Sequence, residues 1–81
     1  MKELYAMKEF DLYTGNDCHC CEILKENMTK KDYERCNIYD VDDEENLHLM
    51  AKYSILAVPC LIANGQKITG VNAIIDFLRT H

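Results

Sequence analysis

The sequence predicts a single α/β domain over residues 1–81, built on a four-stranded mixed sheet with helices on both faces. The length of 81 residues fits one small domain. The composition, 48% hydrophobic and 28% charged, is ordinary for a globular protein. Hydrophobic patterns indicate the element order β-α-β-α-β-β-α. The first strands alternate with helices and are expected to be parallel, and the last two are expected to form an antiparallel hairpin.

The first half of the chain contains two predicted strands with a helix between them. Residues 9–13 (EFDLY) alternate as in a strand, and residues 14–17 (TGND) are typical of a turn. A helix is predicted over about residues 20–31, with Asp17 as its N-cap or first-turn acid. The apolar face of this helix consists of Cys21, Leu24 and Met28. Residues 36–41 (CNIYDV) predict the second strand.

The second half contains a helix, a hairpin and a last helix. Residues 42–45 (DDEE) indicate a helix start, because acidic side chains favour the positive end of a helix dipole. The expected apolar face of that helix consists of Leu47, Met50 and Ala51. Cys60–Ala63 is a short apolar run typical of a buried strand, and the Asn64-Gly65 turn leads into a returning strand over Gln66–Thr69. Asn72 is expected to cap the last helix. The inward residues of that helix are Ile74, Phe77 and Leu78.

Charge and hydropathy exclude several classes of protein. Lys and Arg number 9 and Asp and Glu number 14, so the net charge is −5, which disfavours binding to nucleic acid. No apolar run approaches the roughly 20 residues of a membrane span. Residues 1–10 are charged and lack the uninterrupted apolar stretch of a secretory signal. We therefore expect a monomeric cytoplasmic protein that binds neither nucleic acid nor a membrane.

The cysteines indicate redox chemistry or metal binding. Their number is odd, and three of the five cluster, unlike the pattern of a secreted disulfide scaffold. They are Cys18, Cys20, Cys21, Cys36 and Cys60. Cys18 and Cys21 form a C-x-x-C motif between a predicted strand and a predicted helix. Backbone N–H groups at a helix start favour a thiolate on the first cysteine, and the second lies one turn further on. Such a pair can attack a disulfide, form a mixed disulfide and resolve it.

The alternative is a metal-binding or metal-transfer module that uses Cys18, Cys20, Cys21 and Cys60. Zinc needs three or four ligands, usually from two separated pairs, and the sequence has no second C-x-x-C. The spacing therefore favours redox chemistry. His19 is either a cation that further favours the thiolate or a solvated loop residue. A vicinal disulfide between Cys20 and Cys21 would be strained, so Cys20 is expected to be a bystander or a site of off-pathway oxidation.

Four stretches of the chain resemble a known family. Residues 13–21 (YTGNDCHCC), followed by a helix, resemble the start of glutaredoxins and glutaredoxin-like redoxins, which include the small hydrogen donors of ribonucleotide reductase. Val41-Asp42, Asn46-Leu47 and residues 53–59 (YSILAVP) resemble thioredoxin, in which a similar run precedes a cis-proline. The resemblance covers nearly the whole chain from Glu9 onward. It implies a thioredoxin-like fold and a thiol–disulfide oxidoreductase.

The resemblance also implies roles for individual residues. Cys18 matches the attacking thiol and Cys21 the resolving thiol. Pro59 is then preceded by a cis peptide bond, and Val58 offers its backbone to an extended substrate. Val58, Pro59 and His19 are the implied substrate-binding residues. The implied partners are a disulfide-containing protein, with ribonucleotide reductase as one candidate, and a reductant that is a thioredoxin-reductase-like flavoprotein or glutathione. No cofactor is implied beyond the Cys18–Cys21 disulfide.

The chain departs from the family pattern at three places. His19-Cys20 stands where common glutaredoxins have Pro-Tyr and thioredoxins Gly-Pro. Asn16-Asp17 and residues 70–73 (GVNA) replace the basic residue and the Gly-Gly motif that serve glutathione, which favours the flavoprotein as reductant. Cys60 follows Pro59, where thioredoxins usually have Thr. The loop should bring Cys60 near Cys18, as an alternate disulfide partner, a metal ligand or a small apolar side chain.

Overall fold

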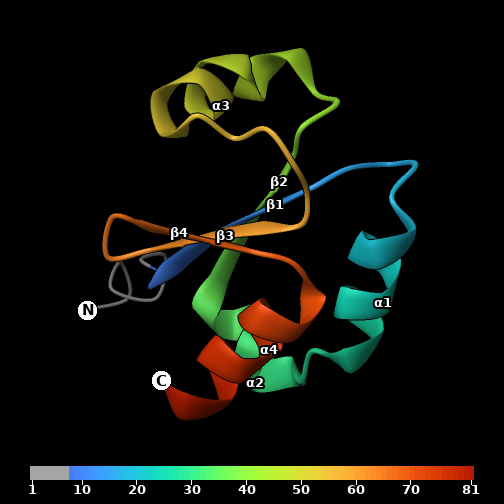
Figure 1. The fold of residues 1–81 in the computed structure, drawn as a ribbon, viewed down its shortest axis with the longest axis vertical. Coiled ribbons are helices and arrows are strands. Elements are labelled where there is room, and N and C mark those ends of the chain that lie inside the picture. The colour runs from blue at the N-terminus through green and yellow to red at the C-terminus, as the bar shows by residue number, and fades with distance from the viewer. Residues whose placement is uncertain (1–7) are drawn as a thin grey trace.

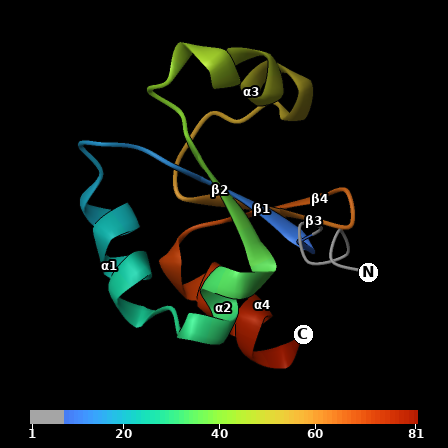
Figure 2. The same cartoon turned by 180° about the vertical axis from the view of Figure 1, so that it is seen from behind.

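The structure, a computed structural model, describes residues 8–81 of the chain. Most of the N-terminal segment for which we predict no secretory signal lies outside this range. Within it, no helix is both long and apolar enough to cross a membrane. Figure 1 and Figure 2 show the element order, which is β1 (Phe10–Thr14), α1 (His19–Asn27), α2 (Lys30–Arg35), β2 (Cys36–Asp40), the short 3-10 helix η2 (Glu44–Asn46), α3 (Leu47–Tyr53), β3 (Cys60–Ala63), β4 (Gln66–Thr69) and α4 (Val71–Thr80).

The four strands form one mixed sheet in the order β2-β1-β3-β4, which confirms the predicted class. β1 is parallel to β2 and antiparallel to β3, and β3 is antiparallel to β4. Alternation with helices therefore predicts the direction of β2 correctly but not that of β3. The reason is visible in the register, because Cys60 at the start of β3 pairs with Tyr13 near the end of β1. The chain returns from α3 to the same end of the sheet at which β2 finishes.

Helices cover both faces of the sheet, as predicted. Figure 1 shows α3 on one face and α1, α2 and α4 on the other. The core under α1, α2 and α4 is formed by Phe10, Leu12, Leu24, Met28, Cys36, Leu61, Ala63, Ile74 and Leu78. The smaller cluster under α3 contains Tyr13, Ile55, Cys60 and Ile62. Side chains alternate between the two faces along β1 and β3, which is why both central strands are buried on both sides.

The predicted helix over residues 20–31 is interrupted at Met28 and Thr29, so it is two helices rather than one. α1 ends at Asn27, Met28 is extended (φ −80°, ψ 138°), and a separate helix, α2, begins after Thr29. The Thr29 side chain accepts a hydrogen bond from the Asp32 N–H, and the Asp32 side chain accepts one from the Thr29 N–H. This reciprocal capping box starts α2, so the chain turns where the apolar stripe alone suggests continuity.

Two predicted helix caps are also wrong. The N-cap of α1 is Cys18 rather than Asp17, because the Cys18 sulfur accepts the hydrogen bond from the Cys21 N–H. The N-cap of α4 is Gly70 (φ 99°, ψ 151°), so Asn72 lies inside the helix. The backbone at Gly70 has a positive φ, which glycine adopts without steric cost.

The apolar face of α3 differs from the predicted one. Met50 packs against the sheet together with Leu49 and Tyr53, whereas Leu47 is 55% exposed and Ala51 is exposed. The acidic run also does not open α3 itself, because the 3-10 helix η2 takes up Glu44–Asn46 and α3 begins at Leu47. The predicted hairpin between β3 and β4 is confirmed, with φ of 52° at Asn64 and 79° at Gly65.

Candidate active site

The first turn of α1 carries the C-x-x-C motif. Cys18 is extended (φ −126°, ψ 101°) and caps the helix, and its sulfur lies 3.0 Å from the backbone nitrogen of Cys21. Cys18 and Cys21 are joined by a disulfide, with their Cα atoms 5.1 Å apart. The two cysteines are three residues apart, about one helical turn, and this turn brings their sulfurs close enough to form the disulfide. The N–H groups and the dipole at this helix start favour negative charge on the Cys18 sulfur once the disulfide is opened.

The two linked cysteines differ in access to solvent. Cys18 is half-buried, whereas Cys21 is only 1% exposed. A reagent from solution can approach Cys18, but Cys21 lies against the protein interior. The disulfide thus has one reachable sulfur and one protected sulfur.

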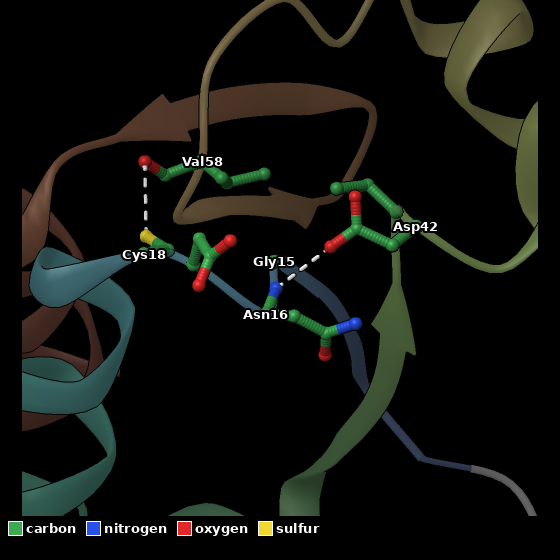
Figure 3. Close-up of a pocket in the computed structure, with 7 residues that line it drawn as sticks. Gly15, Asn16, Cys18, Asp42 and Val58 are labelled. Carbon is green, nitrogen blue, oxygen red and sulfur yellow. Dashed lines mark hydrogen bonds between the residues drawn. The ribbon is translucent and has the colours of Figure 1, made fainter.

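The loop before β3 faces the reachable sulfur. The Val58–Pro59 peptide bond is cis, as the family resemblance implies. The carbonyl oxygen of Val58 lies 3.8 Å from the Cys18 sulfur, and Figure 3 shows this contact. Pro59 is buried, and its carbonyl accepts a hydrogen bond of 3.2 Å from the Gly70 N–H. The start of α4 thereby holds the loop in place.

A groove of about 310 Å³ runs beside the Cys18 sulfur. It is lined by Gly15, Asn16, Asp17, Cys18, Val41, Asp42 and Val58 (Figure 3). The Asp42 carboxylate accepts a hydrogen bond of 2.8 Å from the Asn16 N–H, so the loop before α1 is tied to the end of β2. The Val41 N–H donates to the Thr14 carbonyl at 2.8 Å and continues the β1–β2 pairing to this edge. The groove therefore lies at the carboxyl ends of two parallel strands.

Comparison with solved structures identifies the fold. The chain is similar to the thioredoxin-like protein BC3987, with 25% sequence identity and a TM-score of 0.65, over 88% of this chain and 96% of that one. A mutant form of BC3987 matches with 23% identity and a TM-score of 0.64, over 88% and 95% of the two chains. The chain is thioredoxin-like. No protein-family model matches it, and neither does any curated protein.

In this thioredoxin-like chain, the two residues between the linked cysteines lie on the helix surface. His19 is the first residue of α1 and is exposed, and Cys20 is exposed beside it. Cys20 is a free thiol in this structure. Cys18, Cys21, Val58 and Pro59 are brought together at one place, and His19 and Cys20 border it.

Cys60 belongs to the core cluster under α3. It is 1% exposed and packs with Tyr13, Ile55 and Ile62. The Thr69 hydroxyl donates to its sulfur at 3.9 Å. Burial raises the pKa of the Cys60 thiol above its ordinary value. This environment is that of a small apolar side chain in a packed core.

Cys36 is the other buried free cysteine, at the start of β2 under α2. Burial and the neighbouring Asp32 raise the pKa of its thiol to about 11. No three His, Cys, Asp or Glu side chains in residues 8–81 form a group that could hold a metal ion. The metal-binding alternative therefore has no ligand cluster to rest on in this part of the chain.

Five residues that line the groove are absent from the predicted site, namely Gly15, Asn16, Asp17, Val41 and Asp42. The sequence does contain a signal for them. Side chains that follow two parallel strands meet at one edge of a sheet, and ligands bind there in open α/β folds. Val41-Asp42 directly follows β2, and Gly15 directly follows β1.

Proposed function

We propose that this protein is a thiol–disulfide oxidoreductase that reduces protein disulfides through Cys18 and Cys21. The observation that carries the proposal is the Cys18–Cys21 disulfide at the N-terminus of α1, with the Cys18 sulfur on a groove and 3.8 Å from the Val58 carbonyl. The thioredoxin-like fold supports it. Cys18 is the attacking thiol and Cys21 the resolving thiol.

The proposed reaction has two exchanges. The Cys18 thiolate attacks one sulfur of the substrate disulfide, forms a mixed disulfide and releases the other substrate sulfur as a thiolate. The Cys21 thiolate then attacks the Cys18 sulfur, closes the Cys18–Cys21 disulfide and releases the second substrate thiolate. Two electrons pass from the dithiol to the substrate, and the two protons of the dithiol end on the substrate thiols. The exposure of Cys18 and the burial of Cys21 suit this order of events.

The substrate is proposed to lie along the Val58–Pro59 loop. An extended peptide next to Cys18 would pair with the backbone of Val58 in the manner of an added strand, with Pro59 shaping the loop. His19, exposed next to Cys18, borders the same position. In the dithiol form, a Cys18 S–H at this position would donate a weak hydrogen bond to the Val58 carbonyl. This hydrogen bond is lost when Cys18 gives up its proton and attacks the substrate as a thiolate.

The proposal extends to partners and location. The substrate is a disulfide-containing protein, with ribonucleotide reductase as one candidate. The reductant is a thioredoxin-reductase-like flavoprotein rather than glutathione, since no basic side chain is present among the residues that line the groove. The protein itself carries no cofactor beyond its disulfide and acts as a monomer. A reducing compartment, the cytoplasm, would keep it in the working dithiol form.

The test is to trap the mixed disulfide. The Cys21→Ser variant, reduced and mixed with insulin as a model protein disulfide, is expected to accumulate an adduct linked through Cys18, because the resolving thiol is missing. Peptide mapping by mass spectrometry identifies the linked cysteine. Cys18→Ser should form no adduct, and Cys20→Ser should reduce insulin at the wild-type rate. Absence of any Cys18 adduct with Cys21→Ser, or reduction of insulin by Cys18→Ser, would overturn the proposal.

A further inference from the structure

The groove beside Cys18 is negatively charged. Two carboxylates, Asp17 and Asp42, line it together with the reactive sulfur. Among the described residues, no lysine, arginine or histidine lines it. The acidic run that follows, residues 42–45, is exposed along the same connection between β2 and α3. A charged group that enters the groove therefore meets two negative side chains and no positive one.

The Asp42 carboxylate is held in place at this groove. The Asn16 N–H donates to it at 2.8 Å, and the Asp42 N–H itself donates to Asp40 at 2.8 Å. Gly15 separates it from Val58 without a side chain between them. A Cβ at Gly15 would lie 3.7 Å from the Asp42 carboxylate and 3.5 Å from a Val58 methyl group. The Asp42 carboxylate and the Val58–Pro59 loop therefore both lie next to Gly15, which has no side chain.

We infer that this groove selects disulfides with positive charge next to the cystine and disfavours anionic ones such as glutathione disulfide. The inference rests on the proposed function, because it names the class of substrate for the same two cysteines. A lysine or arginine near the substrate cystine gains attraction from Asp17 and Asp42, and a carboxylate in that position is repelled. The partner we infer is a protein whose reducible cystine lies in a basic segment.

The size of the effect follows from Coulomb's law. A single charge on the substrate about 8 Å from each of two carboxylates in a water-like medium changes the reaction rate severalfold, in opposite directions for a cation and an anion. The two opposite changes multiply in the ratio of the rate for a cationic disulfide to the rate for an anionic one. Even at low salt the charges are partly screened, so we expect this ratio to be about 10. At about 1 M salt the Debye length falls to about 3 Å, and the preference should fall toward unity.

The experiment uses three small disulfides of similar length. They are cystamine, which is dicationic, 3,3′-dithiodipropionate, which is dianionic, and bis(2-hydroxyethyl) disulfide, which is neutral. The reduced wild-type protein is mixed with each in excess, and formation of the Cys18–Cys21 disulfide is followed by acid quenching and mass spectrometry. Each rate is divided by the rate of the same disulfide with dithiothreitol, which removes differences in intrinsic reactivity. The expected normalised cystamine-to-dithiodipropionate ratio is about 10 at low salt.

Two variants assign the preference to the groove. Asp17→Asn with Asp42→Asn removes both carboxylates, and the amide oxygen introduced by the second substitution can still accept from the Asn16 N–H, so the ratio should fall to about 2 or less. Glu26→Gln with Glu34→Gln removes the same net charge from exposed positions on α1 and α2, outside the groove, and should keep the wild-type ratio. Circular dichroism and thermal unfolding establish that both double variants fold.

The outcomes separate the two claims. If the neutral disulfide oxidises Cys18 and Cys21 but the normalised ratio is near unity, charge selection is wrong and the proposed function stands. If the ratio is high but the Asp17 and Asp42 substitutions leave it unchanged, the groove is not its source and the inference is overturned. If the neutral disulfide does not form the Cys18–Cys21 bond at all, the proposed function itself fails.

Discussion

The Cys18 sulfur lies 3.8 Å from the Val58 carbonyl oxygen, although the two residues are 40 positions apart in the chain. This contact places Cys18 on the groove, while its disulfide partner Cys21 is buried against the interior. The two free cysteines of the core, Cys36 and Cys60, are as buried as Cys21. The five cysteines therefore fall into an accessible group and a protected group, which chemical modification can distinguish.

We predict the order in which four cysteines of the reduced protein, Cys18, Cys20, Cys36 and Cys60, are alkylated. Cys18 and Cys20 should react first with iodoacetamide, because both are accessible and the helix N-terminus favours the Cys18 thiolate. Cys36 and Cys60 should react only as the protein unfolds, because burial raises the pKa of both thiols. The measurement is time-resolved peptide mapping by mass spectrometry, with a urea-unfolded sample as control. Alkylation of Cys60 as fast as that of Cys20 would contradict the packing described for it.

Gly15 provides a test of the groove that leaves the cysteines unchanged. A Cβ at this position would have ordinary van der Waals distances of 3.5 Å to methyl groups of Val41 and Val58. Gly15→Ala should therefore fold normally, and Gly15→Val should place additional methyl groups in the groove. We expect Gly15→Val to slow the reduction of insulin by about tenfold through misplacement of the substrate.

The matched control for Gly15→Val is Ala73→Val, which adds methyl groups at an exposed position of α4. It should reduce insulin at the wild-type rate. Thermal unfolding of both variants checks that they fold. Equal insulin rates for Gly15→Val and Ala73→Val would mean that the substrate does not enter this groove.

The burial of Tyr13 leads us to predict that the protein loses stability at alkaline pH. Its side chain is fully buried, and its hydroxyl has no hydrogen-bond partner among residues 8–81. Burial, with smaller effects from Asp11, Tyr39 and Tyr53, raises the pKa of Tyr13 to about 12. A raised folded-state pKa means that the neutral form is favoured by folding. The resulting stability is fully present below the unfolded pKa of about 10 and is lost as the pH rises through about 12.

Tyr13→Phe removes the group that titrates. We expect the variant to be at least as stable as wild type at neutral pH, because it buries no unpaired hydroxyl. Between about pH 10 and pH 12 the wild type should lose about 2 kcal/mol more unfolding free energy than the variant. Urea unfolding at a series of pH values measures this. Tyr33→Phe, which removes a tyrosine on the opposite face, should retain the wild-type alkaline loss, and parallel curves for wild type and Tyr13→Phe would refute the assignment.

The features that could be predicted from the sequence are those that depend on neighbouring residues. The hairpin between β3 and β4 follows from the positive φ angles that Asn64 and Gly65 tolerate. The position of the cysteine pair at a helix start follows from a strand pattern, a turn and an apolar stripe in succession. The cis bond before Pro59 is implied by family resemblance, and the structure confirms it.

The features that could not be predicted depend on competition or on tertiary contacts. Met28 continues the apolar stripe of α1, but the capping box of Thr29 and Asp32 starts a new helix instead. Leu47 fits the periodicity of α3 and is nevertheless exposed, since Leu49 and Tyr53 pack with Met50 against the cluster under α3 instead. The place of Asp42 in the groove depends on the pairing of β1 with β2, so it could be inferred only by combining the two predicted strands and not from the residues around Asp42.

The capping box that redirects the chain also predicts how stability changes at acid pH. Asp32 is buried, and its carboxylate accepts hydrogen bonds from the Thr29 N–H at 2.9 Å and from the Arg79 guanidinium at 3.0 Å. Burial alone would raise the pKa of Asp32, but these hydrogen bonds outweigh it and hold the pKa below its usual value. A depressed folded-state pKa stabilises the fold above the unfolded pKa of about 3.9, and this stability is lost as the pH falls through the folded value.

Asp32→Asn should therefore destabilise the protein at neutral pH and have little effect in strong acid. We expect a loss of about 2 kcal/mol at pH 7, since a charged acceptor of two hydrogen bonds is replaced by a neutral one. The difference from wild type should shrink toward zero as the pH falls through the lowered folded-state pKa of Asp32, because wild-type Asp32 is then neutral as well. Urea unfolding across this range is the measurement, with Glu34→Gln on the exposed side of α2 as control. The Asp32–Arg79 hydrogen bond links α2 to α4, and it depends on pH only if Asp32 is ionised. A difference in unfolding free energy between wild type and Asp32→Asn that stays constant with pH would therefore show that the charge of Asp32 does not matter.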